Sequence, residues 1–262
     1  MEQSPKKQFL LSIFFLFLIG NANLFAQYYQ IRERVQNLQT FDNRLMHYGY
    51  FFGFNSYGYK IQYVNNYTVS PVRNFGDNRG LGLPNIELVK NTGFNVGLIG
   101  DLRLNNYFNL RLEPGLYYSQ RDLLYPESTP GLTSEADLLR EVKSTYIHLP
   151  LLLKFSAARI NNWRPFIVGG FSTAFNLSSN EKNNDDNLNG VFRVTSQTFN
   201  YEVGVGLDFY LPYFKFSPSI RGIFSIQDEL IQDNLTLGQT SPWTSNIVDF
   251  RSQAIVINLT FE

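Results

Sequence analysis

Apolar and polar side chains alternate along most of this chain, in runs with the period of a strand. In residues 93–104, for example, Phe94 and Leu98 fall on one face and Asn95 and Asp101 on the other. A period of two is typical of a β-strand with one apolar and one polar face. The alternation predicts eight strands, at residues 47–55, 93–104, 108–120, 146–156, 164–176, 199–210, 214–226 and 253–262. The sequence does not fix the facing of the strands at 47–55 and 164–176.

The joints between these strands alternate in length. Short joints fall at about 105–107, 157–163 and 211–213, and long polar ones at about 56–92, 121–144, 177–197 and 227–250. Outer-membrane barrels combine an even number of antiparallel strands with short periplasmic turns and long outer loops. We therefore predict an all-β fold, a transmembrane antiparallel up-and-down β-barrel of about eight strands with both termini in the periplasm. A secreted β-sandwich or lipocalin-like barrel is the alternative, disfavoured because soluble strands are rarely this apolar outward.

The composition fits a sheet that faces lipid. Aromatic residues make up 16% of the chain and charged residues only 17%, and membrane barrels display aromatics on their outer surface. Lys plus Arg and Asp plus Glu are equal at 22 each, so we expect no nucleic-acid partner. The chain has no cysteine, which excludes a disulfide, a thiolate metal site and a lipobox.

The first residues have the pattern of a secretory signal peptide. Lys6 and Lys7 precede an apolar run, and Ala26 ends a small-residue cleavage site before Gln27. That run is too short to span a bilayer as a helix. We expect export by the general secretory route, removal of the signal peptide and integral residence in the outer membrane. The expected division is a signal peptide at 1–26, a periplasmic segment at 27–46 and an outer-membrane barrel at 47–262.

The segment before the first strand has a helical pattern of its own. Ile31, Val35 and Leu38 recur at helical spacing beside charged residues, which predicts a short amphipathic helix. This helix is either a leader packed under the barrel or a candidate docking segment for a partner.

Charged residues occupy the face of the strands that we expect to point inward. This candidate lumen network consists of Asp101, Arg103, Arg111, Glu113, His148, Lys154, Glu202, Asp208, Lys215 and Arg221. An eight-stranded barrel is just wide enough to be filled by its own side chains, so a packed interior is the main interpretation. A gated polar path or a proton-linked site around His148 is the alternative.

Opposite charges in this set predict particular strand pairings. A hairpin turning at Leu211-Pro212 would put Asp208 opposite Lys215. The same register would put Glu202 opposite Arg221. In the hairpin at 93–120, Asp101 and Arg111, and likewise Arg103 and Glu113, are expected to be direct or diagonal neighbours.

The chain carries little that suggests catalysis. It has two histidines and neither a nucleophile elbow, nor a metal-spaced histidine cluster, nor a phosphate-binding loop. We therefore expect no enzyme, catalytic residue, metal, cofactor or small-molecule substrate. The acidic stretch 180–189 is interpreted as a solvated outer loop rather than a calcium site. A lipid-modifying barrel enzyme using His148 or a serine at the rim, and a small-solute channel or adhesin, remain alternative functions.

Four longer runs resemble the PorT family of the type IX secretion system, called SprT in gliding relatives. They are GFNVGLIGDLRL at 93–104, LREVKSTYIHLPLLLKF at 139–155, RPFIVGGFSTAF at 164–175 and FKFSPSIRG at 214–222. The resemblance covers the barrel, and it is less clear at 56–90 and 177–190. It implies an integral outer-membrane protein of the Bacteroidota that works with other secretion components in the export of cargo proteins, and in some relatives in gliding motility. It implies no catalytic residue.

Overall fold

The computed structural model describes residues 35–63, 86–125, 134–234, 241–245 and 247–262. The chain separates into two units, Met1–Gln36 and Asn37–Glu262, and everything below except the remarks on Val35 concerns the second. The predicted signal peptide and Ile31 lie outside the described residues. Among the described residues, no helix has the length and apolar character needed to cross a membrane.

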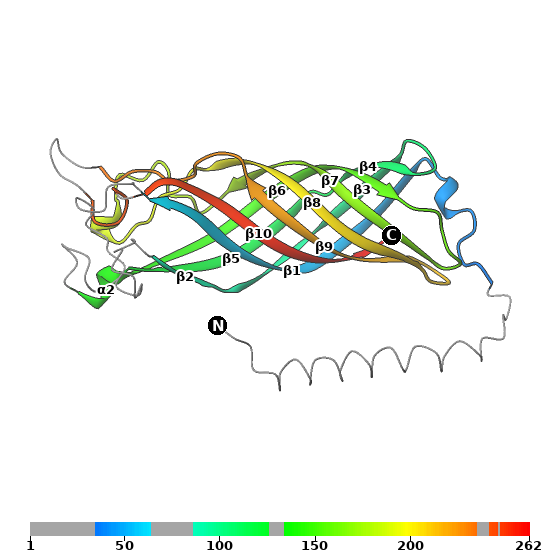
Figure 1. The fold of residues 1–262 in the computed structure, drawn as a ribbon, viewed down its shortest axis with the longest axis horizontal. Coiled ribbons are helices and arrows are strands. Elements are labelled where there is room, and N and C mark those ends of the chain that lie inside the picture. The colour runs from blue at the N-terminus through cyan, green and yellow to red at the C-terminus, as the bar shows by residue number, and fades with distance from the viewer. Residues whose placement is uncertain (1–34, 64–85, 126–133, 235–240, 246) are drawn as a thin grey trace, which may run out of the picture. The chain divides into compact units, whose positions relative to one another are not determined.

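The second unit consists mainly of antiparallel strands (Figure 1). The strands are β1 (Met46–Tyr63), β2 (Glu87–Lys90), β3 (Thr92–Arg103), β4 (Phe108–Leu112), β5 (Gly115–Leu124), β6 (Leu139–Ser156), β7 (Trp163–Asn176), β8 (Gln197–Tyr210), β9 (Lys215–Ser225) and β10 (Ile247–Phe261). Three short helical turns accompany them: η1 (Phe41–Asn43), α2 (Glu135–Leu138) and η2 (Asn187–Asn189).

These ten strands occupy eight strand positions around a closed barrel. Strands β2 and β3 share one position because both pair with β5, and β4 and β5 share another because both pair with β6. Closure comes from β1, which pairs with β10 on one side and β3 on the other. The described strands thus confirm the predicted all-β up-and-down barrel.

The two faces of the wall differ as the alternation predicts. Phe94 and Leu98 are exposed on the outside of β3, whereas Asn95 and Asp101 are buried inside. The structure also fixes the facing of the two strands for which the sequence does not. Inward residues are the odd-numbered ones of β1 from His47 to Tyr59 and the even-numbered ones of β7 from Arg164 to Asn176. The outer surface is therefore apolar. Pairing between the strands satisfies their backbone N–H and C=O groups within the sheet, as lipid requires.

Several strands are longer than the sequence pattern predicts. β1 extends to Tyr63 and β6 begins at Leu139, so the joints expected at 56–92 and 121–144 are shorter. The outward residues of these extensions, such as Lys60 and Lys143, are polar and exposed. Strands that leave the lipid lose their apolar outward face, and the pattern that marked them in the sequence ends there.

The register of the β8–β9 hairpin differs from the predicted one by two residues. Tyr210 lies opposite Lys215 and Gly204 opposite Arg221, so the predicted facing pairs Asp208–Lys215 and Glu202–Arg221 are wrong. The chain turns over residues 211–214, where the amide of Leu211 donates to the carbonyl of Phe214 at 3.0 Å. The longer turn accommodates Pro212 and moves each inward residue to a diagonal position.

The helix predicted through Leu38 is not continued at that residue. Leu38 has a φ of 49°, which lies in the left-handed region and is incompatible with a right-handed helix. Val35 is exposed. The only helical turn described before β1 is η1, which lies between Leu38 and the start of the barrel.

A charged substitution on the outward face should destabilise the barrel more when it lies deeper in the membrane. Val203 lies in the middle of β8 and is exposed, so Val203→Arg should lower the free energy of unfolding in lipid vesicles by about 2–4 kcal/mol. Gln62→Arg, at the exposed outer end of β1, is the matched control and should change it by under about 1 kcal/mol. Equal losses in the two variants, measured by urea titration, would contradict a lipid-facing wall.

Candidate functional site

Buried ion pairs occupy the half of the lumen nearer the short turns, the end that faces the periplasm in outer-membrane barrels. At their centre is Arg111 of β4, whose Nη2 lies 2.7 Å from both Oδ2 of Asp101 and Oε1 of Glu262. Nη1 of Arg111 lies 3.4 Å from Oε1 of Glu113. Asp101 and Arg111 are direct partners in the β3–β4 ladder, which confirms that predicted pair.

The network continues across the barrel through a second arginine. Arg221 of β9 lies 2.8 Å from Oε2 of Glu113 and 3.3 Å from Oε2 of Glu202. Glu202 also contacts His148, with 2.6 Å between Oε1 and Nε2. The predicted contact of Glu202 with Arg221 therefore exists, but as a diagonal contact rather than a facing pair.

Two lysines complete the set. Lys154 of β6 lies 2.7 Å from Oδ2 of Asp208, a carboxylate that also accepts a hydrogen bond from the hydroxyl of Ser217 at 2.6 Å. Lys215 lies 2.6 Å from Oε2 of Glu262. Buried charges are expensive unless they are paired, and this arrangement gives each of these cations a carboxylate.

Of the ten predicted network residues, nine are buried and paired with another member or with Glu262. The exception is Arg103, which lies opposite Asn109 and donates to Asn106, so its predicted pairing with Glu113 is wrong. The register of β3 with β4 places Arg103 near the periplasmic rim instead.

Sequence reasoning missed several charged residues inside the barrel. Glu262 and Arg121 each lie two positions after a residue that the pattern directs inward, Thr260 and Ser119, and that parity is a usable signal. Arg164 lies on β7, whose facing was undecided. At the mouth of the barrel, Asp42 lies in η1 and Arg159 in the β6–β7 turn, where no periodic pattern indicates direction.

Above the ionic network, aromatic side chains fill the lumen. A buried cluster contains Phe51, Tyr57, Ile99, Tyr117, Tyr146, Ala174, Ile223, Ala254 and Val256. Arg121 lies among the tyrosines, with its guanidinium carbon 4.3 Å from the ring centre of Tyr59 and Nη2 donating to the hydroxyl of Tyr146 at 2.7 Å. Cation–π contacts of this kind compensate part of the cost of burying a guanidinium.

The outer end of the lumen is covered by the loops. Phe192 and Val194 from the β7–β8 loop and Leu230 and Trp243 from the β9–β10 loop pack into one cluster with residues of the strand ends. Asp186 caps η2 and also accepts from the amide of Asn234, at 3.0 Å. The stretch expected to be a solvated loop is therefore partly buried, and the described residues contain no cluster of metal-ligating side chains.

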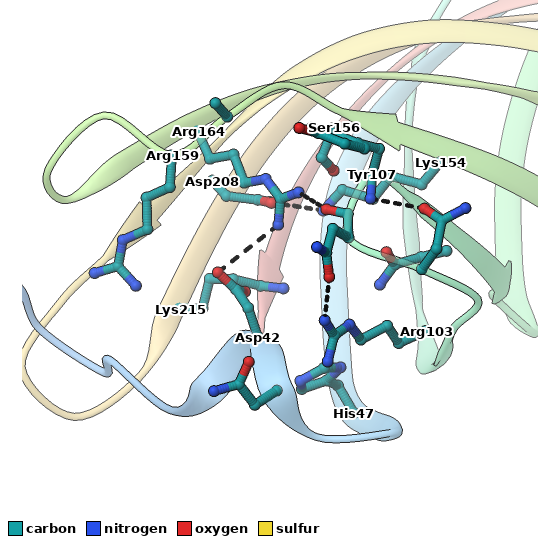
Figure 2. Close-up of a pocket in the computed structure, with 15 residues that line it drawn as sticks. Asp42, His47, Arg103, Tyr107, Lys154, Ser156, Arg159, Arg164, Asp208 and Lys215 are labelled. Atoms are coloured by element: carbon teal, nitrogen blue, oxygen red, sulfur yellow. Dashed lines mark hydrogen bonds and ion pairs between the residues drawn. The ribbon is translucent and has the colours of Figure 1, made fainter.

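A cavity of about 330 Å³ lies at the periplasmic mouth (Figure 2). The turns between β3 and β4 and between β6 and β7 form its sides, and η1 crosses beside it. Phe41 of η1 is buried and stacks on His47, with ring centres 4.5 Å apart. The hydroxyl of Tyr210 donates to Asp42 at 2.8 Å, which fixes η1 against β8.

Glu229 is a buried carboxyl group near the outer cap, and its pKa is shifted. Burial raises the pKa of Glu229, which lies in the β9–β10 loop, above its ordinary value. Its carboxylate accepts hydrogen bonds from the amide of Ser252 at 3.0 Å and from the hydroxyl of the same residue at 2.7 Å. These hydrogen bonds oppose the effect of burial without cancelling it.

A closed antiparallel barrel with an apolar exterior and a packed, charged interior defines an integral β-barrel of an outer membrane. Residues 25–230 match the family described as "Outer membrane protein beta-barrel domain", and the chain belongs to this family. The match ends before β10, the strand whose pairing with β1 closes the barrel. No curated protein matches the chain.

Solved structures with a similar fold include outer-membrane proteins. OprG from Pseudomonas aeruginosa is 12% identical over 82% of this chain and 93% of that chain, with a TM-score of 0.44. Neisserial surface protein A is 8% identical over 82% and 97%, with a TM-score of 0.40. AlkL in DMPC bilayers is 12% identical over 81% and 89%, with a TM-score of 0.39. These likenesses are too distant to carry an argument about function.

The Lys154–Asp208 pair offers a direct test of the lumen. Lys154→Met leaves a buried carboxylate without its cation and should lower the free energy of unfolding by about 3–5 kcal/mol. Adding Asp208→Asn removes the uncompensated charge and should recover most of that loss. Urea titrations of both singles and the double variant measure the coupling, and strictly additive losses would mean that the pair does not interact.

The raised pKa of Glu229 predicts a pH-dependent effect. A carboxyl whose folded pKa exceeds its unfolded pKa loses stability as the pH rises from the unfolded value through the folded one. Glu229→Gln should therefore raise the melting temperature at pH 8 by more than at pH 4. The exposed Glu141→Gln is the matched control. A larger gain at pH 4 than at pH 8 would reverse the sign and contradict the assignment.

Proposed function

We propose that this protein is a non-enzymatic accessory of the type IX protein secretion system, required for export of cargo proteins and, in gliding bacteria, for motility. It acts by binding: the outward face holds it in outer-membrane lipid, and its ends contact other components of the machine. The candidate docking segment with Ile31, Val35 and Leu38 belongs to this proposal. Signal-peptide removal after Ala26 is part of the same route to the outer membrane.

One observation carries the choice of binding over transport. The lumen is packed with aromatic side chains at mid-height and covered by loops at its outer end, whereas the periplasmic mouth holds a cavity of about 330 Å³. In a barrel built in this way, the polar lumen is accessible through the cavity at the periplasmic end. That is the side from which exported proteins and periplasmic machine components approach.

The resemblance to PorT proteins supplies the choice of machine. Its four runs correspond to β3, β6, β7 and the hairpin entering β9. They also carry inward charges of the lumen and its periplasmic mouth, namely Asp101, Arg103, His148, Lys154, Arg164, Lys215 and Arg221. The similar segments therefore include charged residues of the barrel interior as well as apolar residues of its outward face.

The positions of the two histidines favour a non-enzymatic role. His148 is fully buried against Glu202 and Tyr117. His47 stacks on Phe41, and its Nε2 lies 2.8 Å from the carbonyl of that residue. Each imidazole is thus held in a packed environment, which suits a structural part better than general acid–base chemistry on a lipid substrate.

The test is a comparison of the periplasm and culture medium from a deletion strain, its parent and a strain complemented with the wild-type gene. Cargo proteins should accumulate in the periplasm of the deletion strain by several-fold and return to the medium on complementation. Unchanged secretion would contradict the proposal. A changed lipid composition or solute uptake in its place would favour the lipid-modifying enzyme or the channel.

A further inference from the structure

The cavity at the periplasmic mouth is strongly cationic. Five of its lining side chains carry positive charge, and two carry negative charge. The cations are Arg103, Lys154, Arg159, Arg164 and Lys215, and the carboxylates are Asp42 and Asp208. They come from β3, β6, β7, β8, β9, η1 and the β6–β7 turn, so strands and turns from around the barrel converge on one space.

The five cations differ in how they are compensated. Lys154 and Lys215 each contact a carboxylate within 2.7 Å, as described above. Arg164 is 3.7 Å from Asp42, and its nearer partners are the carbonyls of Ala157 and Asn106. The two lysine charges are thus paired with carboxylates inside the lumen, whereas Arg164 has only a more distant carboxylate.

Arg103 and Arg159 contact only neutral oxygens in the part of the chain that the structure describes. Arg103 donates to Oδ1 of Asn106 at 2.5 Å. Arg159 donates to the carbonyls of Asn37 and Leu38 and stacks on the ring of Tyr210, with 3.6 Å to its centre. Neither guanidinium has a described carboxylate within salt-bridge distance.

Two of these arginines donate to the same residue. Asn106 accepts from Arg103 through its side-chain oxygen and from Arg164 through its backbone carbonyl. Like charges held near one another repel, and the repulsion is relieved when an anion binds between them. The guanidinium groups are already fixed by neutral partners, so they lose little freedom when they bind a carboxylate.

We propose that this cavity binds carboxylate side chains of an acidic peptide segment that enters from the periplasm. Guanidinium groups match carboxylates in charge and geometry, and arginine clusters are a recurrent means of recognising acidic motifs. A volume of about 330 Å³ holds more than one small ion. The lining residues face the lumen and the turns rather than the apolar outer wall, which favours a peptide over a bilayer lipid.

This inference rests on the proposed function only for the identity of the partner, which would be a cargo protein or a periplasmic component of the secretion machine. The binding chemistry can be measured on the purified barrel alone. If the peptide binds and secretion is unchanged in the deletion strain, the proposed function fails and the site stands. If secretion fails and the peptide does not bind, the proposed function stands and the site fails.

The experiment uses the full barrel folded in detergent and a short fluorescent peptide with two glutamates, followed by fluorescence anisotropy. The same peptide with glutamines in place of the glutamates is the charge control. The glutamate peptide should bind at least about tenfold more tightly, and its affinity should fall with salt. Equal affinity for the two peptides overturns the proposal.

The variant for this test is the double substitution Arg103→Gln and Arg159→Gln, compared with Lys60→Gln and Lys143→Gln at the exposed outer end. The cavity variant should lose at least about tenfold in affinity for the glutamate peptide, and the control variant should bind as wild type does. Arg103→Lys with Arg159→Lys keeps the charge and should retain part of the affinity, which separates recognition from misfolding.

Two further results would overturn the assignment even with folded protein. One is unchanged peptide affinity in the glutamine variant, which would place binding elsewhere on the barrel. The other is binding of inorganic phosphate, measured by calorimetry, without any binding of the glutamate peptide. That result would make a small oxyanion the ligand of the cavity.

Discussion

The requirement that every backbone hydrogen bond be satisfied inside lipid governs the rest of this structure. An open sheet would leave two unpaired edges in the membrane, and here β1 removes both by pairing with β3 and β10. Closure fixes one face of every strand outward and the other inward. The apolar exterior and the charged interior are therefore two results of one topological constraint.

A narrow closed barrel must then fill its interior, and this chain does so in layers. Ion pairs around Arg111 and Arg221 occupy the periplasmic half, aromatic side chains surround Arg121 above them, and loop residues cover the outer end. Each layer joins side chains from strands that are not neighbours in the barrel, so these interior contacts hold the strands together. The periplasmic mouth differs, because Arg103 and Arg159 face a cavity without carboxylate partners among the described residues.

Alternation along the chain was sufficient to predict the closed barrel, its eight strand positions and the inward face of most strands. It also placed nine of the ten network residues in the paired interior. Register was not predictable in the same way: the turn at 211–214 is longer than the Leu211-Pro212 turn, and a shift of two residues preserves facing while changing every partner. Residues outside strands, such as Asp42 and Arg159, have no periodicity, and only the folded structure brings them to the cavity.

Aromatic side chains and loop residues pack the lumen, so the folded barrel should not conduct ions, and the proposed role in binding depends on this property. Single-channel recording in planar bilayers tests this most directly, with a porin of known conductance inserted as the positive control. We expect insertion without resolvable current steps under either polarity. Reproducible ohmic steps from the folded barrel would contradict it and would show that the aromatic layer opens to a continuous aqueous path.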